Sequence, residues 1–180
     1  MKYSFHPYHS YFQKRAQNEI NKLKVSLPQA QIEHVGSTSI PGVGGKGIID
    51  LCVSVPKKTL DGTSQIIQKL DYEFKLSGGV LDERLFHQKT VVYPDGHKQK
   101  FHLHLTYIDS KDWKDMITFR NFLQKNSNLA KEYSNIKHKA VLAARQFRNK
   151  KDKKEAYMNA KRPLINKIVG LIQKGNATLQ

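Results

Sequence analysis

A glycine-rich segment, HVGSTSIPGVGGKGIID over residues 34–50, leads into an apolar run that ends in a carboxylate. Its early part offers small and hydroxylated residues that could hold a phosphate at a turn, namely Gly36, Ser37, Thr38 and Ser39. Backbone amides at such a turn donate hydrogen bonds to an anion, and hydroxyl groups can add to them. Asp50 could then hold Mg²⁺ or Mn²⁺ against the same phosphate, because both ions favour carboxylate oxygen. The segment therefore predicts a phosphate-binding turn beside a metal-binding carboxylate.

Structural interpretations of the same residues stay open. The glycines can serve only to allow positive φ angles, and the hydroxyl groups can cap a short helix. Asp50 lies in an apolar strand, where a carboxylate is costly unless it is paired or bound to a metal. If its role is only structural, the partners expected for it are Arg84 and Lys46.

Two well-known phosphate-binding motifs do not fit this segment. A Walker A motif requires a glycine, four residues, and then Gly-Lys followed by Ser or Thr. Around Lys46, the first position is Ile40 and the last is Gly47. A dinucleotide-binding fingerprint requires glycines that open a helix, whereas these lead into a strand.

Hydrophobic spacing predicts the elements that position this segment. A helical period over residues 8–27 indicates an amphipathic helix. Alternation over residues 31–35 and an apolar run over residues 47–55 indicate two strands, the second of them buried. A second helix is expected over residues 63–70.

Two further strands, residues 84–94 and 100–108, should form a hairpin around Asp95 and Gly96. His102 and His104 lie two residues apart in the second of these strands, so strand geometry turns both side chains to one face. With Asp50 on a neighbouring strand they could complete a mixed site for a divalent metal ion. The alternative is that both are structural histidines.

The C-terminal part is helical and basic. The chain carries 31 Lys and Arg against 15 Asp and Glu, and residues 111–180 hold 17 of the former and 5 of the latter. Such a surface attracts polyanions such as RNA as well as phosphorylated ligands. The alternative is a solvated helical surface, and the charge run at residues 148–154 is expected to form a connection or the start of a helix.

Length and composition bound the class of protein. A chain of 180 residues is expected to form one domain. No apolar run approaches the roughly 20 residues that span a bilayer, and the N-terminus lacks the apolar core of a secretion signal. A soluble, cytoplasmic protein without a membrane partner is therefore expected. The single cysteine, Cys52, cannot form an internal disulfide.

The order strand, Gly-Ser, loop, strand with Asp resembles the signature of the nucleotidyltransferase superfamily. The longer motif at residues 33–50 also resembles the defining motif of the GrpB family, and ERLF, FHLHL and EAYMNAK follow at 83–86, 101–105 and 155–161 in that family's order. The resemblance implies an α+β fold with a nucleotidyltransferase-like mixed sheet, flanking helices and a helical basic C-terminal part. It also implies a family whose members are mostly uncharacterised, some of them fused to a dephospho-CoA kinase. Residues 1–180 would form a single GrpB-like domain, with the site in residues 1–110 and the basic helices in residues 111–180.

Two departures from the superfamily pattern bear on activity. Cys52 occupies the second acidic position, which removes a carboxylate that two-metal phosphoryl transfer uses. The third acid, expected on a later strand, is replaced by the segment that contains His102 and His104. Binding with one metal ion or with none becomes the more plausible expectation.

The leading hypothesis is a protein that binds a nucleotide or another phosphorylated small molecule and could transfer a nucleotidyl group with a divalent metal. Lys46 and Arg84 would stabilise developing negative charge, and Lys161 would contact phosphate from a helix face that it shares with Tyr157. The competing hypothesis is a non-catalytic binding module whose basic helices bind RNA or a protein partner.

Overall fold

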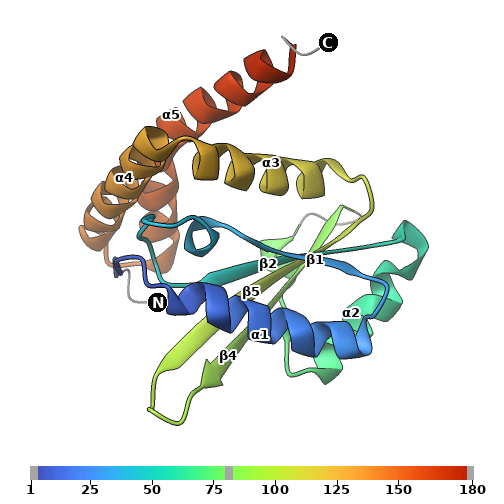
Figure 1. The fold of residues 1–180 in the computed structure, drawn as a ribbon. Coiled ribbons are helices and arrows are strands. Elements are labelled where there is room, and N and C mark those ends of the chain that lie inside the picture. The colour runs from blue at the N-terminus through green and yellow to red at the C-terminus, as the bar shows by residue number, and fades with distance from the viewer. Residues whose placement is uncertain (1–3, 80–82, 178–180) are drawn as a thin grey trace. The chain divides into compact units, whose positions relative to one another are not determined.

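The computed structural model describes residues 4–79 and 83–177. Its strands form one five-stranded sheet in the order β1-β2-β5-β4-β3 (Figure 1). The strands are β1 (Gln31–Val35), β2 (Ile49–Val55), β3 (Glu73–Phe74), β4 (Arg84–Val92) and β5 (Lys98–Tyr107). The pairing of β2 with β5 is parallel and the other three pairings are antiparallel. The expected mixed sheet is thus confirmed, and β3 is a short strand that the sequence did not predict.

The chain divides into two compact units. The sheet unit comprises residues 10–39 and 48–117, and the helical unit comprises residues 1–9, 40–47 and 118–180. Two segments from the N-terminal half, which include residues 4–9 and 40–47, therefore belong with the C-terminal helices. The division into residues 1–110 and 111–180 that the sequence suggested does not predict this. The expectation of a single domain stays a prediction.

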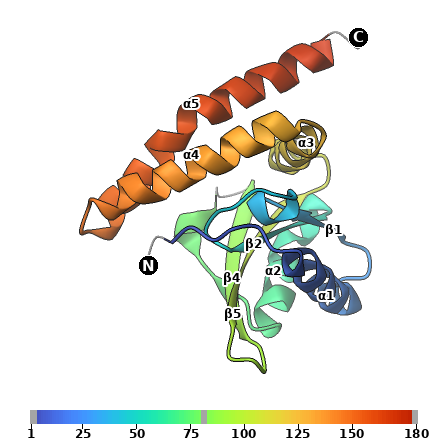
Figure 2. The same cartoon turned by 60° about the vertical axis from the view of Figure 1, so that its left-hand side comes forward.

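Helices α1 (Tyr11–Ser26) and α2 (Leu60–Lys69) cover the same face of the sheet. The register places His34, Leu51, Leu103 and His87 in one row across four strands, so their side chains share a face. At one end of this row His34 contacts Gln13 of α1, and at the other end His87 contacts Ser64 of α2. Figure 2 shows both helices on one side of the sheet. The row that contains Asp50 and His102 therefore lies on the opposite face.

The covered face holds the core of the sheet unit. Its fully buried members include Leu23, Ile49, Leu51, Ile67, Tyr72, Phe101, Leu103 and Leu105. One charged pair is buried with them: Glu19 of α1 lies 2.6 Å from the ammonium nitrogen of Lys89 on β4 and accepts a hydrogen bond of 3.1 Å from the hydroxyl of Tyr72. The face combines apolar packing with polar groups that find their partners inside the fold.

The helical unit contains part of α3 (Lys111–Lys125) and the whole of α4 (Ser127–Arg145) and α5 (Lys150–Ala177). Helices α4 and α5 run side by side in both views (Figures 1 and 2). Their shared core includes Ile40, Val43, Leu123, Tyr133, Leu164 and Ile168. Because α5 begins at Lys150, most of the charge run at residues 148–154 is the start of a helix.

The other expected elements are confirmed with small shifts in their bounds. The helices expected at residues 8–27 and 63–70 are α1 and α2, and the expected hairpin turns at Asp95 and Gly96, where the backbone N–H of His97 donates to the carboxylate of Asp95. Among the helices of residues 4–79 and 83–177, no helix combines the length and the apolar character needed to cross a membrane.

Candidate functional site

The glycine turn and Asp50 are in close contact within the sheet unit. Gly36 follows β1 with a φ of +71°, a backbone conformation that side-chain-bearing residues rarely adopt. A Cβ atom placed on Gly36 would lie 2.5 Å from Oδ2 of Asp50. The residue must therefore be glycine both for its backbone conformation and for the approach of the carboxylate.

The hydroxyl groups after Gly36 differ in their availability. Thr38 and Ser39 are buried, and their hydroxyls donate to the backbone carbonyls of Ile48 and Gly36 at 3.1 and 2.6 Å. Ser37 is only half-buried and makes no side-chain hydrogen bond with the residues described. A phosphate at this turn would meet the Ser37 hydroxyl, while Thr38 and Ser39 could contribute through their backbone amides. The short 3₁₀ helix Ser37–Ser39 is held in place by the other two hydroxyls.

The histidine that precedes the turn has structural partners on both ring nitrogens. His34 is buried, with Nε2 2.9 Å from the hydroxyl of Thr38 and Nδ1 3.2 Å from Oε1 of Gln13. It therefore links α1 to the short helix Ser37–Ser39, whose residues the sequence predicts as phosphate ligands. Its place on the covered face separates it from Asp50.

Asp50 meets two histidines on the face opposite α1 and α2, as the sequence predicted. Nδ1 of His102 lies 3.2 Å from Oδ1 of Asp50, a hydrogen bond, and Nε2 of His104 lies 3.7 Å from the same oxygen. The parallel register explains the geometry, because Asp50 pairs with His102 and Cys52 pairs with His104. Strand alternation then turns all four side chains to one face.

The two histidines keep the Asp50 carboxyl ionised. Burial acts to raise the pKa of Asp50, but the hydrogen bonds and charges of His102 and His104 act in the opposite direction and outweigh it. The pKa of Asp50 is therefore held well below its usual range. An ionised carboxylate in turn orients the imidazole rings, since the N–H of each ring is attracted to it.

Phe86 of β4 closes this cluster from the next strand. Its ring centroid lies 4.9 Å from that of His102 and 5.3 Å from that of His104. The register also places Glu33 of β1 opposite Cys52, so a second carboxylate shares this face. Nδ1 of His104 is buried and has no hydrogen-bond partner among the residues described.

Asp50, His102 and His104 together are candidate ligands for a metal ion. One carboxylate and two imidazoles are a donor set that can hold a divalent transition ion. In the part of the chain that the structure describes, however, no group of three such side chains is arranged to hold one. Both rings turn a nitrogen towards Oδ1 of Asp50, so the donors face one another rather than a common point. As arranged, the residues do not fit a metal ion.

Arg84 lies away from this cluster. It is opposite Thr106 in the register, four residues along β5 from His102, which corresponds to about 13 Å. Its NH1 atom lies 3.1 Å from a carboxylate oxygen of Asp112, the residue that balances its charge. Asp50 and Arg84 therefore do not form the ion pair that the structural alternative expected.

Lys46 and Lys161 meet within the helical unit. Their ammonium nitrogens lie 4.9 and 4.3 Å from the centroid of the Tyr157 ring, so two cations lie close to one aromatic ring. Lys161 is 9% exposed. The spacing of four residues between Tyr157 and Lys161 on α5 thus has the consequence expected of a helix.

A comparison with protein families shows which family the chain belongs to. The model of the family described as GrpB protein matches residues 2–170. The chain belongs to the GrpB family. Among curated relatives, UPF0157 protein YqkA of Bacillus subtilis is 32% identical over 73% of this chain, and UPF0157 protein PA4798 of Pseudomonas aeruginosa is 30% identical over 86% of it. The alignments span 38% and 60% of those two proteins, and their names assign no activity.

Solved structures support the fold of this GrpB family member. Conserved protein GrpB from Enterococcus faecalis matches with a TM-score of 0.69 and 24% identity, over 91% of this chain and 98% of that one. A Cid1 poly(U) polymerase mutant bound to MgATP matches with a TM-score of 0.55 and 16% identity, over 77% of this chain and 45% of that one. The GrpB chain thus has a fold similar to that of a nucleotidyltransferase.

Sequence patterns did not predict two neighbours of the Asp50 cluster, Phe86 and Glu33, or the partner of Arg84, Asp112. Phe86 lies in the ERLF motif, but its contact with the histidines depends on the pairing of β4 with β5. Glu33 precedes the glycine motif, and only the register puts it opposite Cys52. Asp112, the partner of Arg84, comes from the first turn of α3 and had no signal in the sequence.

Proposed function

We propose that this cytoplasmic GrpB protein binds a nucleotide or another phosphorylated small molecule at the turn beside Asp50, and that it can transfer a nucleotidyl group. The observation that supports this most strongly is the contact between Gly36 and Asp50. A left-handed glycine followed by a serine with an available hydroxyl offers hydrogen-bond donors to a phosphate, and a carboxylate whose pKa is lowered by His102 and His104 lies next to them.

The remaining predicted residues receive the following roles in this proposal. Gly36, Ser37, Thr38 and Ser39 contact phosphate. Arg84, which lies about 13 Å away along β5 and is paired with Asp112, is given no role at this turn, nor are Lys46 and Lys161 of the helical unit. His102 and His104 contact the substrate or a divalent ion.

A divalent cation, Mg²⁺ or Mn²⁺, forms a separate part of the proposal. Asp50, His102 and His104 would ligate it, and both rings would first have to turn away from Oδ1 of Asp50. Imidazole nitrogen favours Mn²⁺ over Mg²⁺, which prefers oxygen ligands. Metal-free binding of the phosphorylated ligand needs no such rearrangement.

The experiment is a thermal-shift panel on the wild type and Asp50→Asn. The four nucleoside triphosphates and dephospho-CoA are tested with Mg²⁺, with Mn²⁺ and with EDTA, because a ligand that binds only the folded state raises the melting temperature. We expect a shift with at least one nucleotide, a larger shift with Mn²⁺, and loss of the metal increment in Asp50→Asn.

The outcomes separate the two parts of the proposal. If the ligand raises the melting temperature of both proteins equally in EDTA and in metal, the proposed cation is refuted and the phosphate site still stands. A wild type whose melting temperature no ligand changes would refute the phosphate site itself.

A second candidate function is a non-catalytic module that binds RNA. It is favoured by Cys52, which is fully buried where the superfamily has its second acid, and by the charge of the helical unit. Affinity for a short RNA should then fall steeply with salt, survive Asp50→Asn, and drop on charge reversal of the exposed Lys150, Lys151 and Lys154. Binding that Asp50→Asn abolishes would contradict this candidate.

A further inference from the structure

The helical unit contains a pocket of about 650 Å³. Of the residues discussed above, only Ile40 and Leu123 from the core of this unit line it. The floor is apolar and consists of Ile40, Leu123 and Ala130, which are 1%, 0% and 6% exposed. Pro41 and Gly42 form one wall. Pockets of 300–1,000 Å³ with apolar floors are the usual sites for small organic ligands.

The rim of the pocket is polar and carries one cation. Gln124 comes from the end of α3, and Ser127 and Lys131 come from the first turns of α4. All three side chains are exposed, so they can meet a ligand from solvent. They supply an amide, a hydroxyl and an ammonium group within one short stretch of chain.

The charge at the rim is positive and is not balanced from within the described chain. Lys131 makes no ion pair or hydrogen bond with the residues described. Its neighbour Glu132 is turned to Lys167 of α5 at 3.4 Å. Residues 118–180 carry 15 Lys and Arg against 3 Asp and Glu, so the surrounding field is also positive.

From these features we infer that the pocket binds a small organic anion, one that joins an apolar or flat body to a single phosphate or carboxylate group. The body lies against Ile40, Leu123 and Ala130, and Lys131 pairs with the anionic group. Gln124 and Ser127 donate to polar atoms between the two. The inference stands apart from the site at Gly36 and Asp50, because it uses none of the residues of that site.

The lining of the pocket disfavours ligands that are only anionic or only apolar. Inorganic phosphate would leave the apolar floor in contact with water, and a neutral apolar molecule would leave Lys131 without a partner. A ligand that satisfies both parts gains from burial of apolar surface and from a charge-assisted hydrogen bond. Binding should therefore require both parts in one molecule.

The test is isothermal titration of the full chain with phenyl phosphate, AMP and octanoate, and with phenol and inorganic phosphate as half-ligands. We expect at least one of the first three to bind ten times more tightly than either half-ligand. Preference for phenyl phosphate or AMP identifies a flat ring, and preference for octanoate identifies an alkyl chain. If none of the three exceeds the half-ligands, the inference is wrong.

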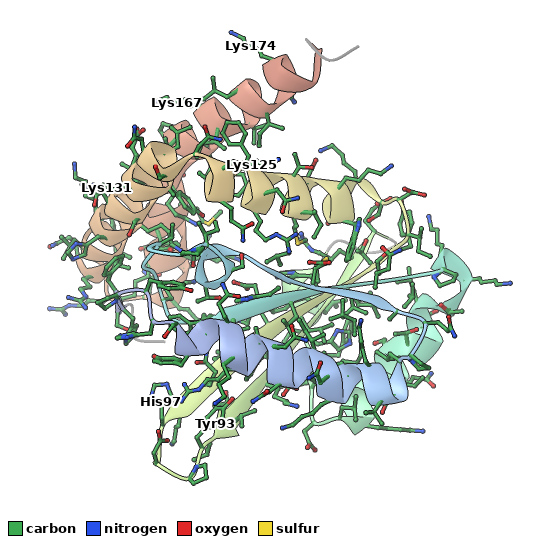
Figure 3. All side chains as sticks on the ribbon, in the orientation of Figure 1. Tyr93, His97, Lys125, Lys131, Lys167 and Lys174 are labelled. Carbon is green, nitrogen blue, oxygen red and sulfur yellow. The ribbon has the colours of Figure 1, made fainter. Side chains whose placement is uncertain are left out.

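Two pairs of variants locate the binding. Lys131→Glu reverses the rim charge at the residue labelled in Figure 3 and should weaken binding at least tenfold, whereas Lys151→Glu makes the same change at the start of α5, next to the end of α4 that does not line the pocket, and should have little effect. Ser127→Trp should fill the pocket and abolish binding, and Asn128→Trp, outside the lining, should not. Equal loss in Lys131→Glu and Lys151→Glu would show only a general charge effect and would overturn the assignment.

Asp50→Asn serves to keep the two sites distinct. It should leave binding of octanoate, which carries no phosphate, unchanged, and a phosphorylated probe bound in the pocket should keep its dependence on Lys131, since Asp50 does not line the pocket. A probe that depends on Asp50 and not on Lys131 belongs to the turn at Gly36, and that result would also overturn the pocket. Circular dichroism melting curves confirm that each variant is folded.

Discussion

The two faces of the sheet use the same residue types in different ways. On the covered face, His87 is fully buried, bonds through Nε2 to the hydroxyl of Ser64 at 2.9 Å, and lies against the ring of Phe74. On the opposite face, His102 and His104 share a carboxylate and keep 18% and 17% of their side chains exposed. Three histidines on two paired strands thus have two distinct environments.

The carboxylates show the same contrast. Glu19 on the covered face is 3% exposed and is matched by Lys89 and Tyr72. Asp50 on the opposite face is 24% exposed and lies next to a turn with an available hydroxyl. Polar groups that are satisfied inside the fold indicate stability, whereas accessible polar groups beside a glycine turn indicate a ligand site.

The largest effect is expected from the buried pair of the covered face. Glu19→Ala leaves the ammonium group of Lys89, 13% exposed, without its carboxylate. The free energy of unfolding should fall by about 3–5 kcal/mol, the usual cost of breaking a buried ion pair from one side. Urea denaturation measures it, and Glu73→Ala, which removes an exposed partner of Lys75, is the control that should change little. A loss as small as that of the control would mean that the covered face is not held by this pair.

The next effect is the pH dependence that His87 gives to stability. Burial lowers the pKa of His87 to about 4, below the value of about 6.5 in an unfolded chain. Between these values the unfolded state binds more protons, so stability is complete above pH 6.5 and is lost as the pH falls towards 4.

Replacing His87 by Gln removes this titration. Between pH 7.5 and 4.5, the wild type should lose about 2–3 kcal/mol more unfolding free energy than His87→Gln. Urea denaturation of both proteins at the two pH values measures these losses. Subtracting one loss from the other cancels the contributions of the carboxylates, which both proteins share. Parallel curves for the two proteins would refute the contrast between His87 and the exposed pair.

A smaller effect on stability is expected at Gly36. Gly36→Ala and Gly96→Ala both place a Cβ at a positive φ, 71° and 76°, which should cost about 1 kcal/mol each. A Cβ on Gly96 meets nothing within 4 Å, whereas one on Gly36 meets Asp50. Gly36→Ala should therefore be the more destabilising of the two in thermal unfolding, and equal losses would show that the carboxylate moves away freely.

Much of the fold followed from the sequence because it depends on local patterns. Alternation predicted β1, β4 and β5, and helical spacing predicted α1, α2 and the C-terminal helices. Strand geometry alone turned His102 and His104 to one face. The parallel pairing of β2 with β5, by contrast, has no signal in either strand; the family resemblance implied a mixed sheet but not which of its strands are parallel.

The parts that were not predicted depend on contacts between distant residues. Arg84 pairs with Asp112, which follows it by 28 positions, and no local pattern distinguishes this carboxylate from the others. Thr38 and Ser39 read as phosphate ligands, yet the carbonyls that engage their hydroxyls are known only once the turn is folded. The membership of residues 40–47 in the helical unit is likewise a matter of packing, which sequence spacing does not encode.

We propose that a phosphate binds at the turn of Gly36, on the face of the sheet opposite α1 and α2. The most direct measurement is the affinity of the nucleotide with the largest thermal shift, by isothermal titration, for the wild type, Gly36→Ala and Gly96→Ala. We expect at least a tenfold loss of affinity for Gly36→Ala, because the added methyl group displaces the carboxylate and closes the turn, and no loss for Gly96→Ala. Wild-type affinity in a folded Gly36→Ala protein would show that the phosphate does not bind at this turn.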